Sequence, residues 1–305
     1  MDAEIWDVFA EAPFGGNPLA VVHDAGALPG AAMAALAREF GFSETVFVQA
    51  GPEGRPRLRI FTPAQELPMA GHPTIGAAFA LERRGRIGGD RATVELGVGP
   101  IELAFERGPD GRLTRAWMDQ GRPRRLGGVD ARTAVAAALG LNEDDLEPDA
   151  QVEGWSCGTP FLIVPLRDLD ALGRARLTLD ALAPWTDPSH RAALCVVVGA
   201  DGDTRCRMFG EALGVVEDPG TGSAHGPLGG WLAAHGRIAP GADGSARFAS
   251  LQGVEMGRPS RLHVRVDWSD GPDAPPRVHV GGAARPVLHG ALASELVADL
   301  TAERP

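Results

Sequence analysis

The chain contains no lysine and no tyrosine, and all 29 of its basic residues are arginine. Without lysine no internal Schiff base can form, which excludes pyridoxal phosphate enzymes and lysine aldolases. A P-loop and a kinase site also need a lysine, so both classes are excluded. Proton transfer in this protein must therefore depend on Glu, Asp, His or Cys.

Cysteine and positive charge are also scarce. The three cysteines, Cys157, Cys195 and Cys206, form no CxxC pair, so neither a disulfide framework nor a metal site is indicated. The net charge of −11 disfavours nucleic-acid partners and anionic membrane surfaces. No apolar run approaches the roughly 18 residues of a membrane span. The acidic start of the chain differs from a signal peptide, so we expect a cytoplasmic protein.

Glycine and proline are plentiful, and their 41 and 25 copies predict many turns in a sheet-rich protein. Residues 119–128 are polar and turn-rich. They mark a predicted boundary between domains 1–119 and 120–305, and a return of the C-terminal tail to the first domain is left open. Outside the two turns described next, helices are predicted over 30–40, 130–139 and about 290–300.

Two glycine turns in the chain are similar to each other. AGHPTIGAAFAL at 70–81 and TGSAHGPLGGWL at 221–232 each follow a charged segment and run into a helix of small and apolar residues. A duplicated two-domain fold and a chance similarity both explain this echo. A helix start carries unpaired N–H groups and about half a positive charge, so each turn is suited to bind an anion such as a carboxylate.

Several side chains near these turns are able to move or share protons: Glu44, His72, Asp218, and Ser223 with His225. Each also has an ordinary structural interpretation. Glu44 suits a capping contact at a strand start, and His72 and Asp218 are common turn residues. Ser223 is an ordinary helix cap. The cysteines, within or beside apolar strands, favour buried thiols over nucleophiles.

Five segments together resemble the phenazine-biosynthesis PhzF-like isomerases, within the diaminopimelate-epimerase superfamily. They are spread along nearly the whole chain in the order of that family. The segments are DVFAEAPFGGNPLAVV (7–22), SETVFV (43–48), RIFTPAQELPMAGHPTIG (59–76), RMFGEALGVVEDPGTGSAHGPLGGWL (207–232) and LQGVEMGRPSRL (251–262).

The resemblance implies an α+β fold of two similar domains, each a curved, mostly antiparallel sheet wrapped as a barrel around a central helix. It implies an active site in the cleft between them and a homodimer. The expected activity is a cofactor-independent isomerisation that moves a double bond by proton transfer in a small cyclic amino or hydroxy carboxylic acid. Trans-2,3-dihydro-3-hydroxyanthranilate is the best candidate for the substrate.

The resemblance also implies roles for individual residues. Glu44 matches the proton-shuttling carboxylate of the family, and His72 and Asp218 match groups that position and polarise the substrate. Gly71, Gly222 and Ser223 match positions that would receive the substrate carboxylate, and Asn17 and Glu66 match positions that support the cleft. His225 is a further substrate-binding candidate, and whether it faces the pocket at the second helix start is left open.

One departure from the superfamily bears on the mechanism. Its epimerases and proline racemases use two cysteines, one at each glycine turn, and neither turn here contains cysteine. A reaction with a single carboxylate base is therefore favoured. An epimerase or isomerase of another amino acid derivative and a non-catalytic binding protein are the alternatives.

Overall fold

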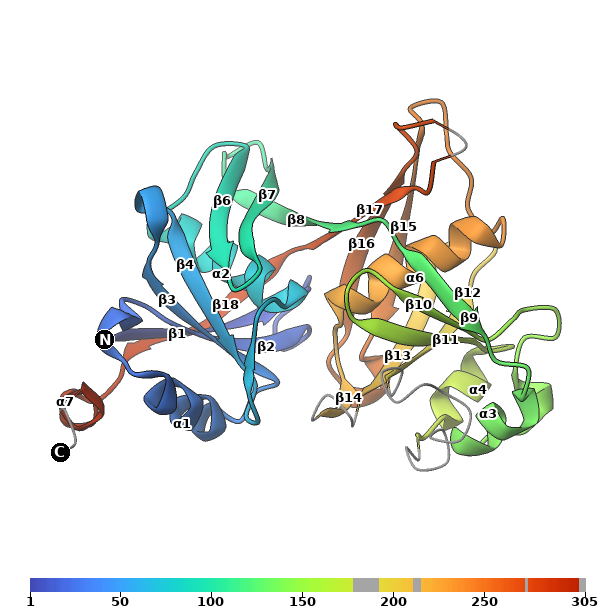
Figure 1. The fold of residues 1–305 in the computed structure, drawn as a ribbon, viewed down its shortest axis with the longest axis horizontal. Helices are drawn as coiled ribbons and strands as arrows, with labels where there is room; N and C mark the ends of the chain where they lie inside the picture. Colours follow the sequence, from blue (N-terminus) through green and yellow to red (C-terminus); the bar gives the residue numbers. More distant parts are fainter. Residues whose placement is uncertain (178–191, 211–214, 272–273, 302–305) are drawn as a thin grey trace. The chain divides into compact units, whose positions relative to one another are not determined.

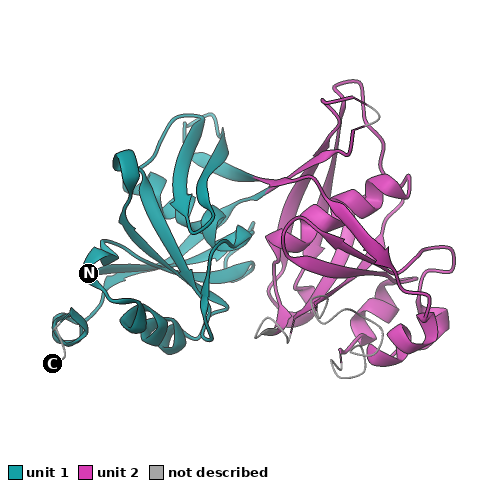
Figure 2. Ribbon diagram, in the orientation of Figure 1, with its two compact units in different colours: residues 1–118, 281–305 teal, residues 119–280 magenta. Residues whose placement is uncertain are grey.

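The computed structural model of the chain describes residues 1–177, 192–210, 215–271 and 274–301 (Figure 1). Its contacts divide the chain into two compact units (Figure 2): unit 1 is Met1–Met118 with Gly281–Pro305, and unit 2 is Asp119–Val280. The C-terminal tail therefore belongs to unit 1, and unit 2 is one continuous segment. No described helix combines the length and the apolar character needed to cross a bilayer.

Unit 1 contains a mostly antiparallel sheet. Its strands are β1 (Asp2–Val8), β2 (Asn17–Val22), β3 (Glu44–Ala50), β4 (Pro56–Phe61), β5 (Glu66–Leu67), β6 (Arg91–Leu96), β7 (Gly99–Arg107), β8 (Leu113–Gly121) and β18 (Ala284–Ala291). β1 pairs antiparallel with β18 and β2, β2 pairs parallel with β3, and β3 pairs antiparallel with β4. β4 pairs antiparallel with β5 and parallel with β6, and β6, β7 and β8 continue antiparallel.

The helices of unit 1 are α1 (Gly30–Phe40), α2 (Gly71–Arg83) and α7 (Ser294–Thr301). α2 is buried at every position from Gly71 to Leu81 and packs on β1, β2, β3 and β18. Its small residues allow this close packing. A Cβ atom at Gly76 would lie only 2.6 Å from the Val8 side chain and 2.5 Å from that of Leu19. The sheet therefore wraps around a central helix (Figure 1).

Unit 2 repeats the pairing order of unit 1. Its strands are β9 (Arg124–Gly128), β10 (Glu153–Ser156), β11 (Pro160–Pro165), β12 (Ala193–Val198), β13 (Thr204–Gly210), β14 (Val215–Asp218), β15 (Ser245–Gln252), β16 (Ser260–Asp267) and β17 (Arg277–Gly282). β10 pairs antiparallel with β9 and β11, β11 parallel with β12, and β12 antiparallel with β13. β13 pairs antiparallel with β14 and parallel with β15, which pairs antiparallel with β16.

The central helix of unit 2 is α6 (Gly222–Ala234), which has the same 13-residue length as α2. It packs on β9, β10, β11 and β16. A Cβ atom at Gly230 would lie 2.4 Å from the Pro123 side chain, so the helix again approaches its surroundings through a glycine. The repeated pairing and the two buried helices confirm the predicted α+β fold of two similar halves, and the echo in the sequence reflects a duplication.

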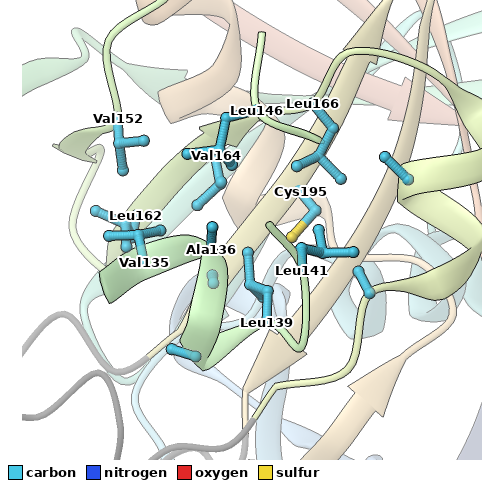
Figure 3. Close-up of a cluster of buried hydrophobic side chains, with 14 of the residues drawn as sticks. Val135, Ala136, Leu139, Leu141, Leu146, Val152, Leu162, Val164, Leu166 and Cys195 are labelled. Atoms are coloured by element: carbon cyan, nitrogen blue, oxygen red, sulfur yellow. The ribbon is translucent and has the colours of Figure 1, made fainter. Parts of the chain in front are cut away.

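Unit 2 also carries two outer helices, α3 (Arg132–Ala138) and α4 (Leu169–Arg174). They share an apolar cluster with β11 and β12 (Figure 3). Its members include Val135, Leu139, Leu162, Val164 and Cys195, each no more than 1% exposed. This cluster anchors the helices to β12 and to β11, on which α6 also packs.

Two segments differ from the sequence prediction. The polar stretch 119–128 lies mostly within β8 and β9, because backbone pairing with a neighbouring strand does not require apolar side chains. The closing helix, predicted from about 290, begins only at Ser294, because residues 284–291 form β18 on β1. Most side chains of β18 are exposed, so it has no alternation of buried and exposed residues for the sequence to display.

Candidate active site

The first group of candidate residues lies in unit 1, where β3 begins. Glu44 is the first residue of β3, its side chain is 16% exposed, and its Oε2 is buried without a hydrogen-bond partner among the described residues. Burial raises the pKa of Glu44 from 4.5 to about 7, and the Ser43 hydroxyl opposes this shift only in part. The carboxyl group is therefore able to take up and release a proton near neutral pH.

His72 lies beside this carboxyl group. It is the second residue of α2, and its Nε2 lies 3.6 Å from Oε2 of Glu44. Its Nδ1 lies 3.4 Å from Nδ2 of Asn17, whose Oδ1 accepts a 3.2 Å hydrogen bond from Ser43. In the structure the Asn17 amide directs its NH2 group toward His72. Nδ1 of a neutral ring then accepts, and the ring proton is on Nε2, which faces Glu44.

These side chains meet because three elements begin at the same place. Asn17 begins β2, Glu44 begins β3, and Gly71 and His72 begin α2. Ala70 precedes the helix, and no side chain caps the helix N-terminus. The predicted residues Asn17, Glu44, Gly71 and His72 therefore lie together in unit 1, at a helix start that favours an anion.

Glu66 has a different environment from this group. It accepts two 2.7 Å hydrogen bonds, from Nε and Nη2 of Arg59, and its side chain is 43% exposed. The pair connects β4 with β5, the short strand that precedes α2. This contact agrees with the interpretation of Glu66 as structural support.

The second group of candidate residues lies in unit 2, where α6 begins. Asp218 ends β14, is 6% exposed, and accepts through Oδ2 a 2.5 Å hydrogen bond from the Thr221 hydroxyl. Gly222 and Ser223 follow as the first two residues of α6, whose N-terminus has no side-chain cap. The predicted residues Asp218, Gly222 and Ser223 therefore lie together in unit 2.

Sequence reasoning did not identify two residues of this second group. Thr221 hydrogen-bonds to Asp218, and Gln252 at the end of β15 hydrogen-bonds to both Thr221 and Asp218. The signal for Gln252 was its place in the segment LQGVEMGRPSRL, but its contacts depend on strand register. Residues 211–214, within the family segment 207–232, lie outside the described residues.

His225 is a core residue in this structure. It is 0% exposed, its Nδ1 lies 2.8 Å from the Thr221 carbonyl oxygen, and its Nε2 lies 2.7 Å from the Ser250 hydroxyl. Burial lowers the pKa of His225 to about 4, so the ring is neutral. Nδ1 then donates to the carbonyl group and Nε2 accepts from Ser250. Both ring nitrogens have protein partners, so the geometry favours a structural role over the predicted contact with substrate.

The three cysteines have the character of inert thiols. Burial raises the pKa of Cys157 and Cys195 to about 12 and that of Cys206 to about 11. At neutral pH they hold their protons and are poor nucleophiles. Within the described parts of the chain, no three His, Cys, Asp or Glu side chains gather closely enough to hold a metal ion.

Comparison with known proteins identifies the family of this chain. The family model described as "Phenazine biosynthesis-like protein" matches residues 6–290, which include both groups of candidate residues. The chain belongs to this family, as the sequence segments predicted.

Individual relatives define the enzyme class. The chain is 38% identical to a protein of Mesorhizobium japonicum that is named an uncharacterized isomerase, over 94% of this chain and 97% of the relative. It is also 38% identical to the trans-2,3-dihydro-3-hydroxyanthranilate isomerase of Pseudomonas aeruginosa, over 86% of this chain and 88% of the relative. The crystal structure of a Bacillus anthracis phenazine biosynthesis protein of the PhzF family has a TM-score of 0.87 at 25% identity, covering 96% of this chain and 99% of that one. The protein is accordingly an isomerase.

Proposed function

We propose that this isomerase moves a double bond by cofactor-free proton transfer in a small cyclic amino or hydroxy carboxylic acid, with trans-2,3-dihydro-3-hydroxyanthranilate as the substrate. The Pseudomonas aeruginosa relative of that name supports the substrate at 38% identity. The equally similar Mesorhizobium relative supports only the isomerase class. The choice of substrate therefore needs a direct test.

The observation that carries the proposal is the buried Glu44 carboxyl group with its pKa raised to about 7. In its ionised form it would take a proton from a ring carbon, so that a C–H bond breaks and an O–H bond forms. It would return this proton to another ring carbon as the double bond moves. A group that acts as base and then as acid works best with a pKa near the working pH.

The surrounding residues supply orientation and charge. His72 would direct its Nε2 proton toward Glu44 and the polar groups of the substrate, and Asp218 would bind an amino or hydroxyl group. Gly71, Gly222 and Ser223 begin helices without side-chain caps, so their backbone N–H groups are suited to a carboxylate. Asn17 would hold the His72 ring. We no longer assign a substrate contact to His225.

The alternatives remain those that the sequence left open. An epimerase of another amino acid derivative would also use a carboxyl group such as Glu44, but the raised pKa values of all three cysteines disfavour a reaction with two thiols. A non-catalytic binding protein has no use for a carboxyl group that titrates near neutrality. We also retain the homodimer as a prediction, which light scattering of the purified protein checks.

The proposal is tested by incubating the protein in D2O with a panel of small cyclic carboxylic acids that includes trans-2,3-dihydro-3-hydroxyanthranilate. Proton NMR then follows each compound. For the named substrate we expect a shifted double bond, with deuterium at the newly protonated ring carbon in those turnovers in which the proton on Glu44 exchanges with solvent before it is returned. Deuterium at one carbon without a shifted double bond would indicate an epimerase instead. If no compound shows either a shifted double bond or exchange, catalysis on this class is contradicted.

A further inference from the structure

Gln252 makes three hydrogen bonds to the turn that precedes α6. It is 0% exposed and ends β15, where it pairs in register with Cys206 of β13. Its Nε2 donates to the backbone oxygen of Asp218 at 2.6 Å and to Oγ1 of Thr221 at 2.9 Å. Its Oε1 accepts from the backbone N–H of Thr221 at 3.2 Å. The side chain therefore both donates to a backbone oxygen and accepts from a backbone N–H group of the turn.

The backbone contacts also fix the direction of every proton in this network. A flipped Gln252 amide would place oxygen against the Asp218 oxygen and NH2 against the Thr221 N–H, so the orientation is determined. Both amide protons are used, and Oγ1 of Thr221 is an acceptor. The single hydroxyl proton of Thr221 is then donated to Oδ2 of Asp218, at 2.5 Å.

Gly253 holds the same turn by direct packing. Its φ of +76° is in the region that favours glycine. A Cβ atom there would lie 2.5 Å from the backbone oxygen of Pro219 and 2.5 Å from that of Arg258. The turn before α6 therefore packs directly on the end of β15, where Gln252 lies.

Unit 1 keeps the glycine packing, because a Cβ atom at Gly97, after β6, would lie 3.0 Å from the backbone oxygen of Pro68, but its described residues show no equivalent of the hydroxyl network. The residue that precedes α2 is Ala70, which has no hydroxyl group, whereas Thr221 precedes α6. The duplicated fold therefore forms without a hydroxyl group at this point. The network is a feature of the unit that contains Asp218 rather than a requirement of the fold.

We infer that Gln252 and Thr221 are positioning residues that hold the Asp218 carboxylate in one orientation and in its ionised form. This inference rests on the proposed role of Asp218 in binding substrate. A hydroxyl donor at 2.5 Å stabilises the ionised carboxylate more than the protonated acid. The carboxylate of Asp218 cannot rotate without losing the hydrogen bond from the Thr221 hydroxyl group to Oδ2.

The test compares Thr221→Val, which removes the hydroxyl group at nearly constant volume, with Thr221→Ser, which keeps it. The readouts are kcat, KM, the melting temperature and the NMR titration of the 13C-labelled Asp218 carboxyl group. We expect Thr221→Val to lower kcat/KM by about 10- to 100-fold, as for loss of a hydrogen bond to a charged group. The Asp218 titration should move to higher pH. Thr221→Ser should restore most of both losses.

Two further variants separate positioning from stability. Gln252→Glu replaces the donating NH2 group with an oxygen, and it should move the Asp218 titration in the same direction as Thr221→Val. Thr204→Val is the matched control, because Thr204 is a 3% exposed threonine of β13 whose hydroxyl group contacts the Cys206 thiol. It should change neither the kinetics nor the titration.

The inference is overturned if Thr221→Val leaves the Asp218 titration in place, or if its loss of activity only follows its melting temperature. Failure of the proposed function gives a different result. If Asp218→Asn keeps wild-type kcat/KM, Asp218 has no role in turnover. The NMR titration still reports whether Thr221 holds the carboxylate, because it does not depend on turnover.

Discussion

Arg59 in unit 1 and Arg207 in unit 2 occupy equivalent places before the central helices. Arg59 of β4 donates two 2.7 Å hydrogen bonds to Glu66 of β5, and its guanidinium lies 5.1 Å from the ring of the phenylalanine two residues later. Arg207 of β13 donates two 2.8 Å hydrogen bonds to Glu217 of β14, and its guanidinium lies 4.9 Å from the equivalent phenylalanine ring. The duplication therefore preserves side-chain contacts as well as strand order.

The far ends of the two helices are equivalent in the same way. Glu4 of β1 accepts a 2.8 Å hydrogen bond from Arg84, the residue after α2, and one of 2.7 Å from the tryptophan two residues later. Glu153 of β10 lies 3.1 Å from His235, the residue after α6, and accepts one of 2.8 Å from the tryptophan two residues later. Each glutamate is 2% exposed. A buried acid thus ties each central helix to its sheet.

Although the strands and their supporting contacts are equivalent, the residues at the starts of the two central helices differ. β3 begins with Glu44, whereas the equivalent strand β12 begins with Ala193. The second residue of the helix is His72 in α2 and Ser223 in α6. Only unit 1 has a carboxyl group with a pKa near 7 at this position. The comparison indicates that the duplicated framework was kept for stability, while the chemistry of the two helix starts diverged, which suits a reaction with one base.

The largest effect on activity is expected at the start of β3, where Glu44 lies and the equivalent strand β12 has Ala193. Glu44→Gln should lower kcat by about 1,000-fold or more, because the amide cannot exchange a proton with the substrate. Steady-state kinetics and circular dichroism check that activity is lost while the fold is kept. Glu102→Gln, at an exposed carboxylate of β7 paired with Arg91, is the matched control and should keep full activity. Wild-type turnover in Glu44→Gln would remove Glu44 as the base.

The pH dependence of the wild-type protein should report the same group. Because the base must be ionised, kcat/KM should rise about tenfold per pH unit below the pKa and level off above about 7. A profile that stays flat from pH 5 to 8 would contradict the assignment. Unit 2 offers no carboxyl group of this kind at Ala193, so no second carboxylate base at that position contributes to the profile.

The raised pKa of Glu44 also predicts a cost in stability. Its folded pKa of about 7 exceeds the ordinary 4.5, so the folded state binds this proton more tightly, and stability is lost as pH rises from about 4.5 to about 7. Above this window the cost is about 3 kcal/mol or less. Glu44→Gln should therefore be more stable than wild type at pH 8, and urea unfolding should show the difference shrinking toward pH 4.5. An equal stability at both pH values would contradict the burial argument.

The equivalence of the far helix ends is tested by Glu4→Gln and Glu153→Gln. Each should lower the free energy of unfolding by about 2 kcal/mol, because a buried charged hydrogen bond is lost. Neither should change kcat/KM by more than about twofold. Denaturant unfolding and kinetics on both variants give the comparison. A loss of activity beyond the loss of stability in only one variant would show that the two ends are not equivalent.

The smallest effect is expected from the cysteines. Replacement of Cys157, Cys195 and Cys206 by alanine should leave kcat/KM within about twofold, because their thiols are protonated at neutral pH. Kinetics of each single variant, measured at a temperature where it stays folded, provide the check. A large loss from any one of them would favour thiol chemistry in one unit.

The parts of the fold that sequence predicted are those with strong local patterns. The amphipathic repeat placed the helix over 30–40, which matches α1, and the glycine turns placed the starts of α2 and α6. The short strands β5 and β14 were not predicted, because they contain acidic residues and their pairing comes from β4 and β13. Gln252 was missed for the same reason, since only strand register brings it to Thr221.

For the site residues too, the sequence indicated identity but not the effects of packing between distant segments. Glu44 and His72 were recognised by resemblance, but the sequence could not show that burial raises the pKa of Glu44 or that the Asn17 amide orients the His72 ring. His225 shows the opposite error. Its position at a helix start suggested a pocket residue, whereas the packing of α6 on the strands buries it completely.

The pairing of β18 with β1 has a consequence for synthesis of the chain. β1 ends at Val8 and its partner β18 begins at Ala284, so one edge of β1 lacks its neighbour until all the residues between them have been made. At about 5–20 residues per second, this delay is roughly 15–60 seconds on the ribosome. Unit 2, which is continuous, is able to complete its sheet first. During that interval the open backbone groups of β1 are available for pairing with other strands, which makes this edge a place where incorrect pairing is able to start.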